Sequence, residues 1–128
     1  PENIPANPSF YILSKGNHAG KPDRKPWRNS FCITTESETE CNYLYWLCWA
    51  LWQAKAFEPY KHGSVVPTIR ITDVANVIQL AKMKHTGSES QTLQTIEKIR
   101  AIDTYEQVII EKIKLLNTLK AVLCRNML

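Results

Sequence analysis

Two short stretches near the start of the chain hold hydrophobic side chains between polar positions, which is typical of β-strands. Residues 9–15 (Ser-Phe-Tyr-Ile-Leu-Ser-Lys) are rich in β-forming side chains and are followed by Gly16. Residues 30–35 (Ser-Phe-Cys-Ile-Thr-Thr) have the same character. The intervening residues 16–26 contain two glycines and two prolines, so we predict a surface loop there. Residues 1–8 are predicted to form an extended arm.

An almost uninterrupted apolar run predicts the main helix, from about Ser37 to about Phe57, before Pro59. The helix begins with Ser-Glu-Thr-Glu, a capping-box pattern in which a hydroxyl and a carboxylate each accept from a free backbone N–H. Residues 43–52 read Tyr-Leu-Tyr-Trp-Leu-Cys-Trp-Ala-Leu-Trp and hold three of the four tryptophans. A helix that is apolar nearly all round is covered on most sides, so we expect most of it to be core.

The three tryptophans of this helix are expected to differ in burial. Trp46 and Trp49 border a polar strip formed by Asn42 and Gln53, and we expect them to be partly exposed. Trp52 lies on an apolar face and is expected in the core. Its replacement by alanine would then cost about 3–5 kcal/mol.

The second half of the chain reads as an extended segment followed by helices. Residues 65–71 have β-forming character, and the proline within them favours an edge or irregular path. Thr72 or Asp73 is predicted to cap a helix that ends near Lys84. A polar linker over residues 85–90 follows.

Two further helices are predicted, over residues 92–100 and 104–124. Asp-Thr-Tyr-Glu at residues 103–106 resembles another capping box, with Asp103 as the cap. The last helix carries a broad apolar stripe, made by Tyr105, Ile109, Ile113, Leu116, Leu119 and Leu123. The stripe is too wide for a strict two-stranded coiled-coil seam, so it is expected to pack against a domain or several helices. Packing within the chain and packing against a partner both remain open.

These elements predict a single α+β domain over residues 1–128. A small, mostly antiparallel sheet packs on the aromatic-rich helix within residues 9–84, and residues 91–124 form a long helical C-terminal segment. A chain of 128 residues is long enough to build one hydrophobic core.

The distribution of charge adds a candidate binding loop. The net charge of +4 is mild, but residues 15–28 carry five basic side chains and a single acid, Asp23. Lysine and arginine at such density contact phosphates of nucleic acids, and Trp27 in the same loop could stack on a base or a sugar. The alternative is an ordinary solvated loop.

The remaining chemistry indicates a non-catalytic protein. The histidines are scattered, the cysteines form no Cys-x-x-Cys pair, and no phosphate-binding glycine motif or nucleophile–histidine pattern is present. We therefore expect no catalytic residues, no metal and no cofactor. Four buried thiols in a reducing cytoplasm are expected, and the tryptophan run falls short of the roughly 20 apolar residues that span a membrane.

The order of motifs resembles the C-terminal half of a target-recognition domain from type I restriction–modification specificity subunits. A strand leads into a basic turn (Ile-Leu-Ser-Lys-Gly-Asn-His-Ala-Gly-Lys, 12–21), and a second strand reads Asn-Ser-Phe-Cys-Ile (29–33). A Tyr-Leu-Tyr-Trp-Leu helix (43–47) follows, and then a Gly-Ser-Val-Val-Pro element that leads into a short Asp-containing helix (63–74 together). The closing helix contains Glu-Gln-Val-Ile-Ile-Glu-Lys-Ile (106–113). The chain also resembles small proteins common on mobile elements of gut Bacteroidetes.

Three departures from the family's pattern suggest a reduced relative of that domain. The family's N-terminal half has no counterpart here, and its Pro-Pro-Leu before the closing helix is replaced by residues 101–105. The polar linker and extra helix at 85–100 are an insertion.

The resemblance implies a DNA-binding module, which together with the charge distribution selects eight contact residues. They are Lys15, Lys21, Arg24, Lys25, Trp27, Arg28, Lys61 and Arg70. The alternative is a protein-interaction module that engages or mimics a restriction–modification subunit through its C-terminal helix. Residues 104–124 would in that case contact a protein partner or a second copy of the chain.

Overall fold

The computed structural model describes residues 7–128, so most of the predicted N-terminal arm lies outside the described residues. Its elements, in order, are β1 (Ser9–Leu13), β2 (Pro22–Asp23), β3 (Ser30–Thr34), α1 (Glu38–Gln53), a short 3-10 helix (Glu58–Tyr60), α2 (Ile71–Lys84) and α3 (Glu89–Arg125). The predicted α+β class is confirmed. The chain divides into two compact units, one up to Leu93 and one from Gln94 to Leu128.

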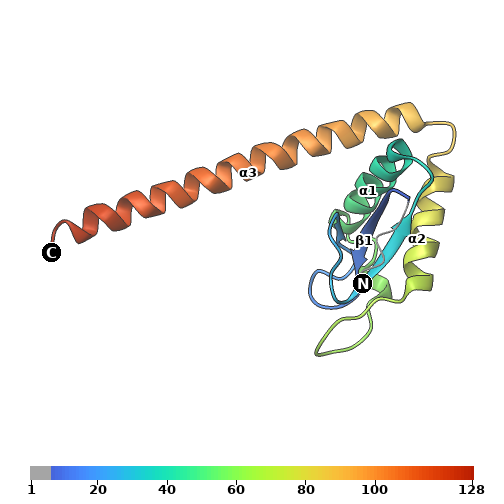
Figure 1. Cartoon of the computed structure of the whole chain (residues 1–128), viewed down its shortest axis with the longest axis horizontal. Coiled ribbons are helices and arrows are strands. Elements are labelled where there is room, and N and C mark those ends of the chain that lie inside the picture. The colour runs from blue at the N-terminus through green and yellow to red at the C-terminus, as the bar shows by residue number, and fades with distance from the viewer. Residues whose placement is uncertain (1–6) are drawn as a thin grey trace. The chain divides into compact units, whose positions relative to one another are not determined.

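The sheet is small and antiparallel, with β1 at its centre between β2 and β3 (Figure 1). Phe10 pairs with Ile33 and Ile12 with Phe31 across β1 and β3. Because side chains alternate along a strand, Phe10 and Ile12 both point to one face, and both are fully buried. The two-residue β2 was not predicted, since its glycine- and proline-rich surroundings are typical of a loop.

Helix α1 begins as predicted at Ser37. The backbone N–H of Glu40 donates to the Ser37 hydroxyl at 3.1 Å, while the Glu40 carboxylate accepts from the N–H of Glu36, one residue earlier than in a standard capping box. The helix ends at Gln53, earlier than predicted. Lys55 adopts a left-handed conformation with φ of 61°, which turns the chain out of the helix.

The core forms where α1 and α2 meet the sheet. Helix α1 contributes Cys41, Leu44, Leu47 and Cys48, and α2 contributes three further aliphatic side chains, Val74, Val77 and Ala81. The partial exposure expected for Trp46 and Trp49 is confirmed, but the expectation for Trp52 is wrong because Trp52 is also only partly buried. The narrow sheet covers only one side of α1, and Trp52 instead lies against the loop that follows β1.

Residues 65–71 form no strand, and their only β-pairing is at Thr68. Thr68 forms isolated β-bridges with Lys15 and with His62, and Ile69 is buried. Helix α2 then starts at Ile71, so Thr72 and Asp73 lie in its first turn and the caps predicted there are wrong. Arg70 occupies the cap position and makes no side-chain capping bond. The predicted end of this helix at Lys84 is confirmed.

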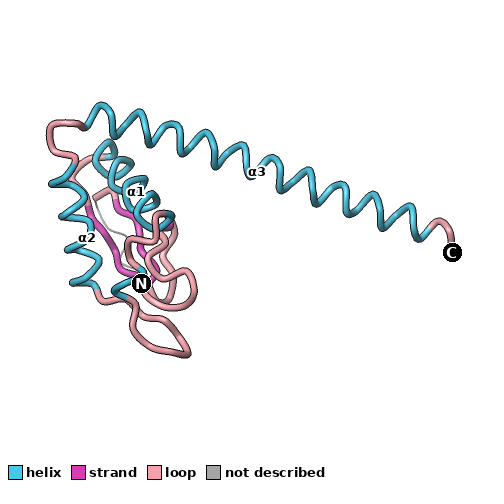
Figure 2. The backbone as a smooth tube through the Cα atoms, turned by 180° about the vertical axis from the view of Figure 1, so that it is seen from behind, coloured by secondary structure: helices cyan, strands magenta, loops and turns pink. Residues whose placement is uncertain are grey.

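Helix α3 is continuous from Glu89 to Arg125, so the predicted division into two helices is wrong (Figure 2). Asp103 lies inside the helix, and its capping-box pattern is not used. The physical reason is that no glycine or proline occurs between Ser88 and Leu128, and neither charged nor apolar residues of this stretch break a helix.

The four thiols fall into two classes, contrary to the expectation that all are buried. Cys41 and Cys48 are buried, whereas Cys32 and Cys124 are exposed. Burial raises the pKa of Cys48 to about 12, so its thiol stays protonated and unreactive at neutral pH.

We predict that two of the four thiols react rapidly with a dithionitrobenzoate reagent under native conditions. Replacing Cys32 and Cys124 with serine should abolish the rapid phase, while unfolding in urea should release the other two thiols. The measurement is absorbance of the released thiolate against time. Four thiols reacting at one rate would contradict this assignment.

Candidate nucleic-acid interface

Two basic segments that are distant in sequence meet at the end of β1. The N–H of Ser14 donates to the carbonyl oxygen of Asn29 at 2.8 Å, and the Ser14 carbonyl accepts from the N–H of Ile69 at 2.9 Å. Two residues further along, the N–H of Gly16 donates to the carbonyl oxygen of Pro67 at 2.8 Å. Ser14 therefore links the loop over residues 15–28 to the segment over residues 61–70.

Three cationic residues adjoin this meeting point, and we call them the basic junction: Lys15, Arg28 and Arg70. Each is a direct sequence neighbour of a residue hydrogen-bonded at Ser14 or of Ser14 itself. All three are exposed, and no hydrogen bond or ion pair within residues 7–128 engages their side chains. Exposed lysine and arginine side chains whose charge is not paired within the protein are suited to contact phosphate.

Two other predicted contacts, Lys21 and Arg24, pack on the aromatic side chains of α1. The Arg24 guanidinium carbon lies 3.8 Å from the centre of the Tyr45 ring, and Arg24 also donates to the Asn42 side chain at 2.9 Å. The Lys21 ammonium lies 5.4 Å from the centre of a Trp52 ring. Both geometries are cation–π contacts, so these cations help hold the loop against α1.

Trp27 is anchored by its ring nitrogen and exposes the rest of its ring. The indole N–H donates to Asp23 at 2.7 Å, while the side chain is 56% exposed. Partial burial raises the pKa of Asp23, but hydrogen bonds from Lys25, Trp27 and Arg24 and the nearby charge of Lys21 outweigh it and hold that pKa below its usual value. Asp23 therefore stays ionised, and Trp27 can offer a ring face but no free N–H donor.

Lys61 is neutralised by a local partner that the sequence interpretation missed. Its ammonium lies 2.6 Å from the Glu58 carboxylate, and its side chain is only 11% exposed. The i, i+3 spacing of the two residues was the available signal. Of the eight residues predicted to contact DNA, the structure leaves Lys15, Lys25, Arg28 and Arg70 as exposed cations without a side-chain partner among the described residues.

Apart from the basic junction, the surface has a depression between α1 and α2. It has a volume of about 300 Å³ and is lined mainly by apolar side chains, among them Leu51, Val77 and Leu80, and also by His85. None of the predicted DNA contacts lines it. Among the described residues, no group of three or more histidine, cysteine or acidic side chains is placed to hold a metal ion.

The described residues thus define a small α+β domain whose three-stranded sheet carries a basic junction at one end of β1. The chain matches a family of unknown function, DUF6943, over residues 1–126, and it belongs to that family. No curated protein and no solved structure gives a significant match. Across the described residues, none of the helices combines the length and the apolar character needed to cross a membrane.

Proposed function

We propose that this protein is a non-catalytic DNA-binding module, a reduced form of a restriction-type target-recognition domain. The observation that carries the proposal is the basic junction. There, exposed cations from two segments distant in sequence adjoin the backbone hydrogen bonds of Ser14. Lys25 lies in the same loop and is also exposed. The four free cysteines are compatible with a reducing cytoplasm, where we expect this activity.

Binding through these side chains would be driven by phosphate contacts and counterion release. Each neutralised phosphate of duplex DNA contributes about −0.9 to the slope of log K against log salt, so three or four cations give a slope of about −3 to −4. A non-specific Kd of about 10⁻⁴ to 10⁻⁶ M is typical of such contacts at physiological salt. The exposed face of Trp27 would add stacking where a base is unpaired.

The proposal predicts a loss of DNA affinity when the basic junction is neutralised. Replacing Lys15, Arg28 and Arg70 with glutamine should weaken binding to a labelled duplex by about tenfold or more at low salt. It should also reduce the salt slope by about two to three, because about one unit is lost per phosphate contact. Fluorescence anisotropy over a salt series measures both quantities.

The matched control removes the same charge elsewhere by replacing Lys82, Lys84 and Lys98 with glutamine; all three are exposed. This control should keep most of the affinity and the salt slope. Equal losses in the two variants would mean that only net charge matters, and absence of binding at low salt would refute the proposal.

A second function, a protein-interaction module, is favoured by helix α3. The aliphatic side chains between residues 104 and 124 are exposed on this helix instead of being packed. Contiguous exposed apolar surface of this kind marks interaction sites. The partner could be a restriction–modification subunit, as the motif resemblance implies, or another copy of the chain.

A further inference from the structure

A loop that we call the valine loop, residues 62–68, projects from the sheet and helices just before α2 (Figure 1, Figure 2). Its two ends are joined by a pair of hydrogen bonds, in which the N–H of His62 and the N–H of Thr68 each donate to the other's carbonyl oxygen at 2.8 Å. Thr68 also forms an isolated β-bridge with Lys15, two residues beyond the end of β1. The base of the loop is therefore fixed beside the basic junction.

The tip of the valine loop is apolar and tightly turned. Val65 is 90% exposed and Val66 is 54% exposed. Gly63 has a φ of 96°, and a methyl group there would lie 2.8 Å from the carbonyl oxygen of Val66, so glycine lets the two sides of the turn approach this closely. A tip held in one shape can contact an apolar group on a partner without a large entropic cost of ordering.

The basic junction can hold a DNA duplex but cannot read its sequence. Its cations adjoin the base of the valine loop, because Lys15 bridges to Thr68 and Arg70 follows two residues later. Contacts to phosphates fix the position of a protein on DNA, whereas sequence is read at base edges in the grooves. The valine loop begins at the junction and extends away from the sheet and helices, so it is placed to reach those edges (Figure 1).

The width of the valine loop selects the groove. Two paired antiparallel chain segments lie about 5 Å apart, and the side chains on either side add to that width. The minor groove of B-DNA is about 6 Å wide, whereas the major groove is about 12 Å wide and admits a two-stranded ribbon. The loop therefore fits the major groove.

The chemistry of the tip selects the base. The base edges of the major groove carry hydrogen-bond donors and acceptors, and their one apolar group is the C5 methyl of thymine. Valine side chains have no donor and no acceptor, so they can distinguish bases only by that methyl group. We propose that Val65 and Val66 contact thymine methyl groups in the major groove, which makes the valine loop the base-reading element of the protein. The inference rests on the proposed DNA-binding function and names the base that it prefers.

An anionic bilayer also places negative charge next to apolar groups, but the tip is too small to anchor the protein there. A single myristoyl chain, with about fourteen carbons, gives only marginal membrane binding with an association constant of about 10⁴ M⁻¹. The side chains of Val65 and Val66 together offer about six carbons, fewer than half of that number. A duplex is therefore the better match for a small apolar tip beside a group of cations.

The test compares two labelled duplexes of the same A·T-rich sequence by fluorescence anisotropy at low salt. One contains thymine, and the other contains deoxyuridine at every thymine position, which removes only the methyl groups. Burial of one methyl group changes an affinity by about fourfold, so one or two contacts should give a preference of about four- to fifteenfold for thymine. Replacing Val65 and Val66 with serine should make the two affinities equal and should leave the salt slope unchanged, because no charge is lost.

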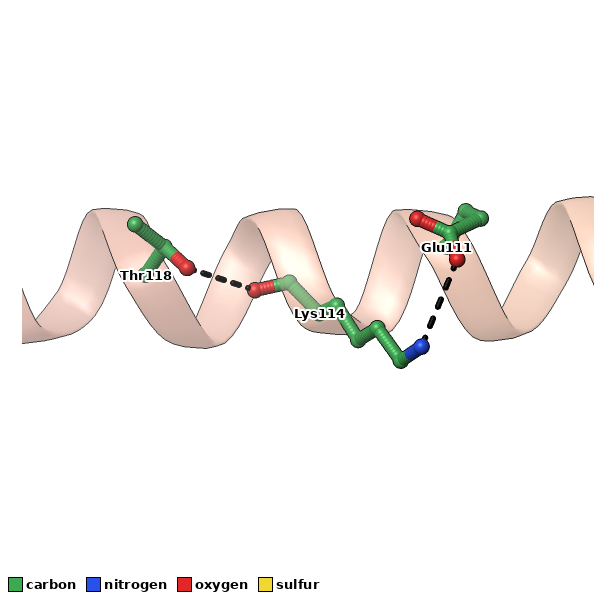
Figure 3. A network of polar contacts seen from close by, with 3 residues as sticks. All are labelled: Glu111, Lys114 and Thr118. Atoms are coloured by element: carbon green, nitrogen blue, oxygen red, sulfur yellow. Dashed lines mark hydrogen bonds and ion pairs between the residues drawn. The ribbon is translucent and has the colours of Figure 1, made fainter.

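The matched control removes two valines from another exposed surface, by replacing Val108 and Val122 of α3 with serine. These side chains are 46% and 42% exposed. Lys114, which lies between them in sequence, has its ammonium 3.3 Å from the Glu111 carboxylate, so its charge is already paired within the helix (Figure 3). This variant should keep the full preference for thymine. Near-ultraviolet circular dichroism of the tryptophans checks that both variants stay folded.

The outcomes separate the inference from the proposed function. Equal affinity of the unmodified protein for the two duplexes, or a preference that survives the loss of Val65 and Val66, would overturn the inference and leave DNA binding by the basic junction intact. No binding to either duplex at low salt would refute the DNA-binding function itself. Binding to vesicles of phosphatidylserine and phosphatidylcholine that is lost with the two valines, without a preference for thymine, would assign the tip to a bilayer and overturn the inference.

Discussion

Replacing Phe10 with alanine should lower the free energy of unfolding by about 3–5 kcal/mol, the usual cost of removing a phenylalanine from a closed core. Phe10 is fully buried on β1, the central strand, and has a strand on either side. Its ring also meets Tyr45 of α1 edge to face, with the ring centres 5.7 Å apart. Neighbouring side chains on both strand and helix cannot collapse into the space without disturbing this packing, so a cavity remains.

Urea unfolding followed by circular dichroism measures the effect as a lower midpoint at an unchanged slope. Trp52→Ala is the informative comparison because it removes a larger side chain from a partly exposed position. We expect a cost of about 1–2 kcal/mol there, since water fills the space and no closed cavity forms. If Trp52→Ala proves as costly as Phe10→Ala, the assignment of the core to the sheet face would be wrong.

This contrast shows why the residues of the core were only partly predictable. The apolar run over residues 43–52 correctly located the main helix, but a helix that is apolar on every side does not reveal which side meets the sheet. The structure buries Cys41 and Cys48 completely and leaves Trp52 at the edge. The large size of tryptophan favours its burial, but a three-stranded sheet is too narrow to cover the side of α1 on which Trp52 lies.

Elements set by neighbouring residues were predicted better than elements set by distant ones. The strands predicted at residues 9–15 and 30–35 and the cap at Ser37 follow from local patterns. The cap is confirmed, and both strands are present, although they end earlier, at Leu13 and Thr34. The two-residue β2 exists only because β1 pairs with it, and no local pattern indicates that. In α3 a local pattern is misleading, because the capping-box residues at Asp103 lie inside a helix that no glycine or proline interrupts.

The candidate site also has features that the local sequence indicates and features that depend on distant contacts. The density of charge in residues 15–28 was visible in the sequence, but the convergence of this loop with Arg70 depends on hydrogen bonds at Ser14 between segments about 55 residues apart. The stacking of Arg24 on Tyr45 was not predictable either, because it requires the loop to fold back onto α1. Spacing alone could have revealed the pairing of Lys61 with Glu58.

Gly20→Ala should destabilise the protein by about 3 kcal/mol or more, because the substitution has two separate costs. Gly20 has a φ of 96°, in the region that side-chain-bearing residues rarely adopt, and holding alanine there costs about 1–3 kcal/mol. A methyl group at Gly20 would also lie 2.8 Å from Cδ2 of Phe57, a ring that is buried in the hydrophobic core. Such overpacking costs a further 1–3 kcal/mol, by rough comparison with other cores.

Gly16→Ala provides the matched control for this prediction. Gly16 has nearly the same φ, 95°, but a methyl group there would meet no atom within 4 Å. Its replacement should therefore carry the backbone cost alone, and the difference between the two variants in urea unfolding isolates the contact with Phe57. Because the N–H of Gly20 also donates to Leu13 at 2.8 Å, displacement of residue 20 would loosen the basic loop from β1. Equal destabilisation by the two variants would show that Phe57 does not fix the position of this loop.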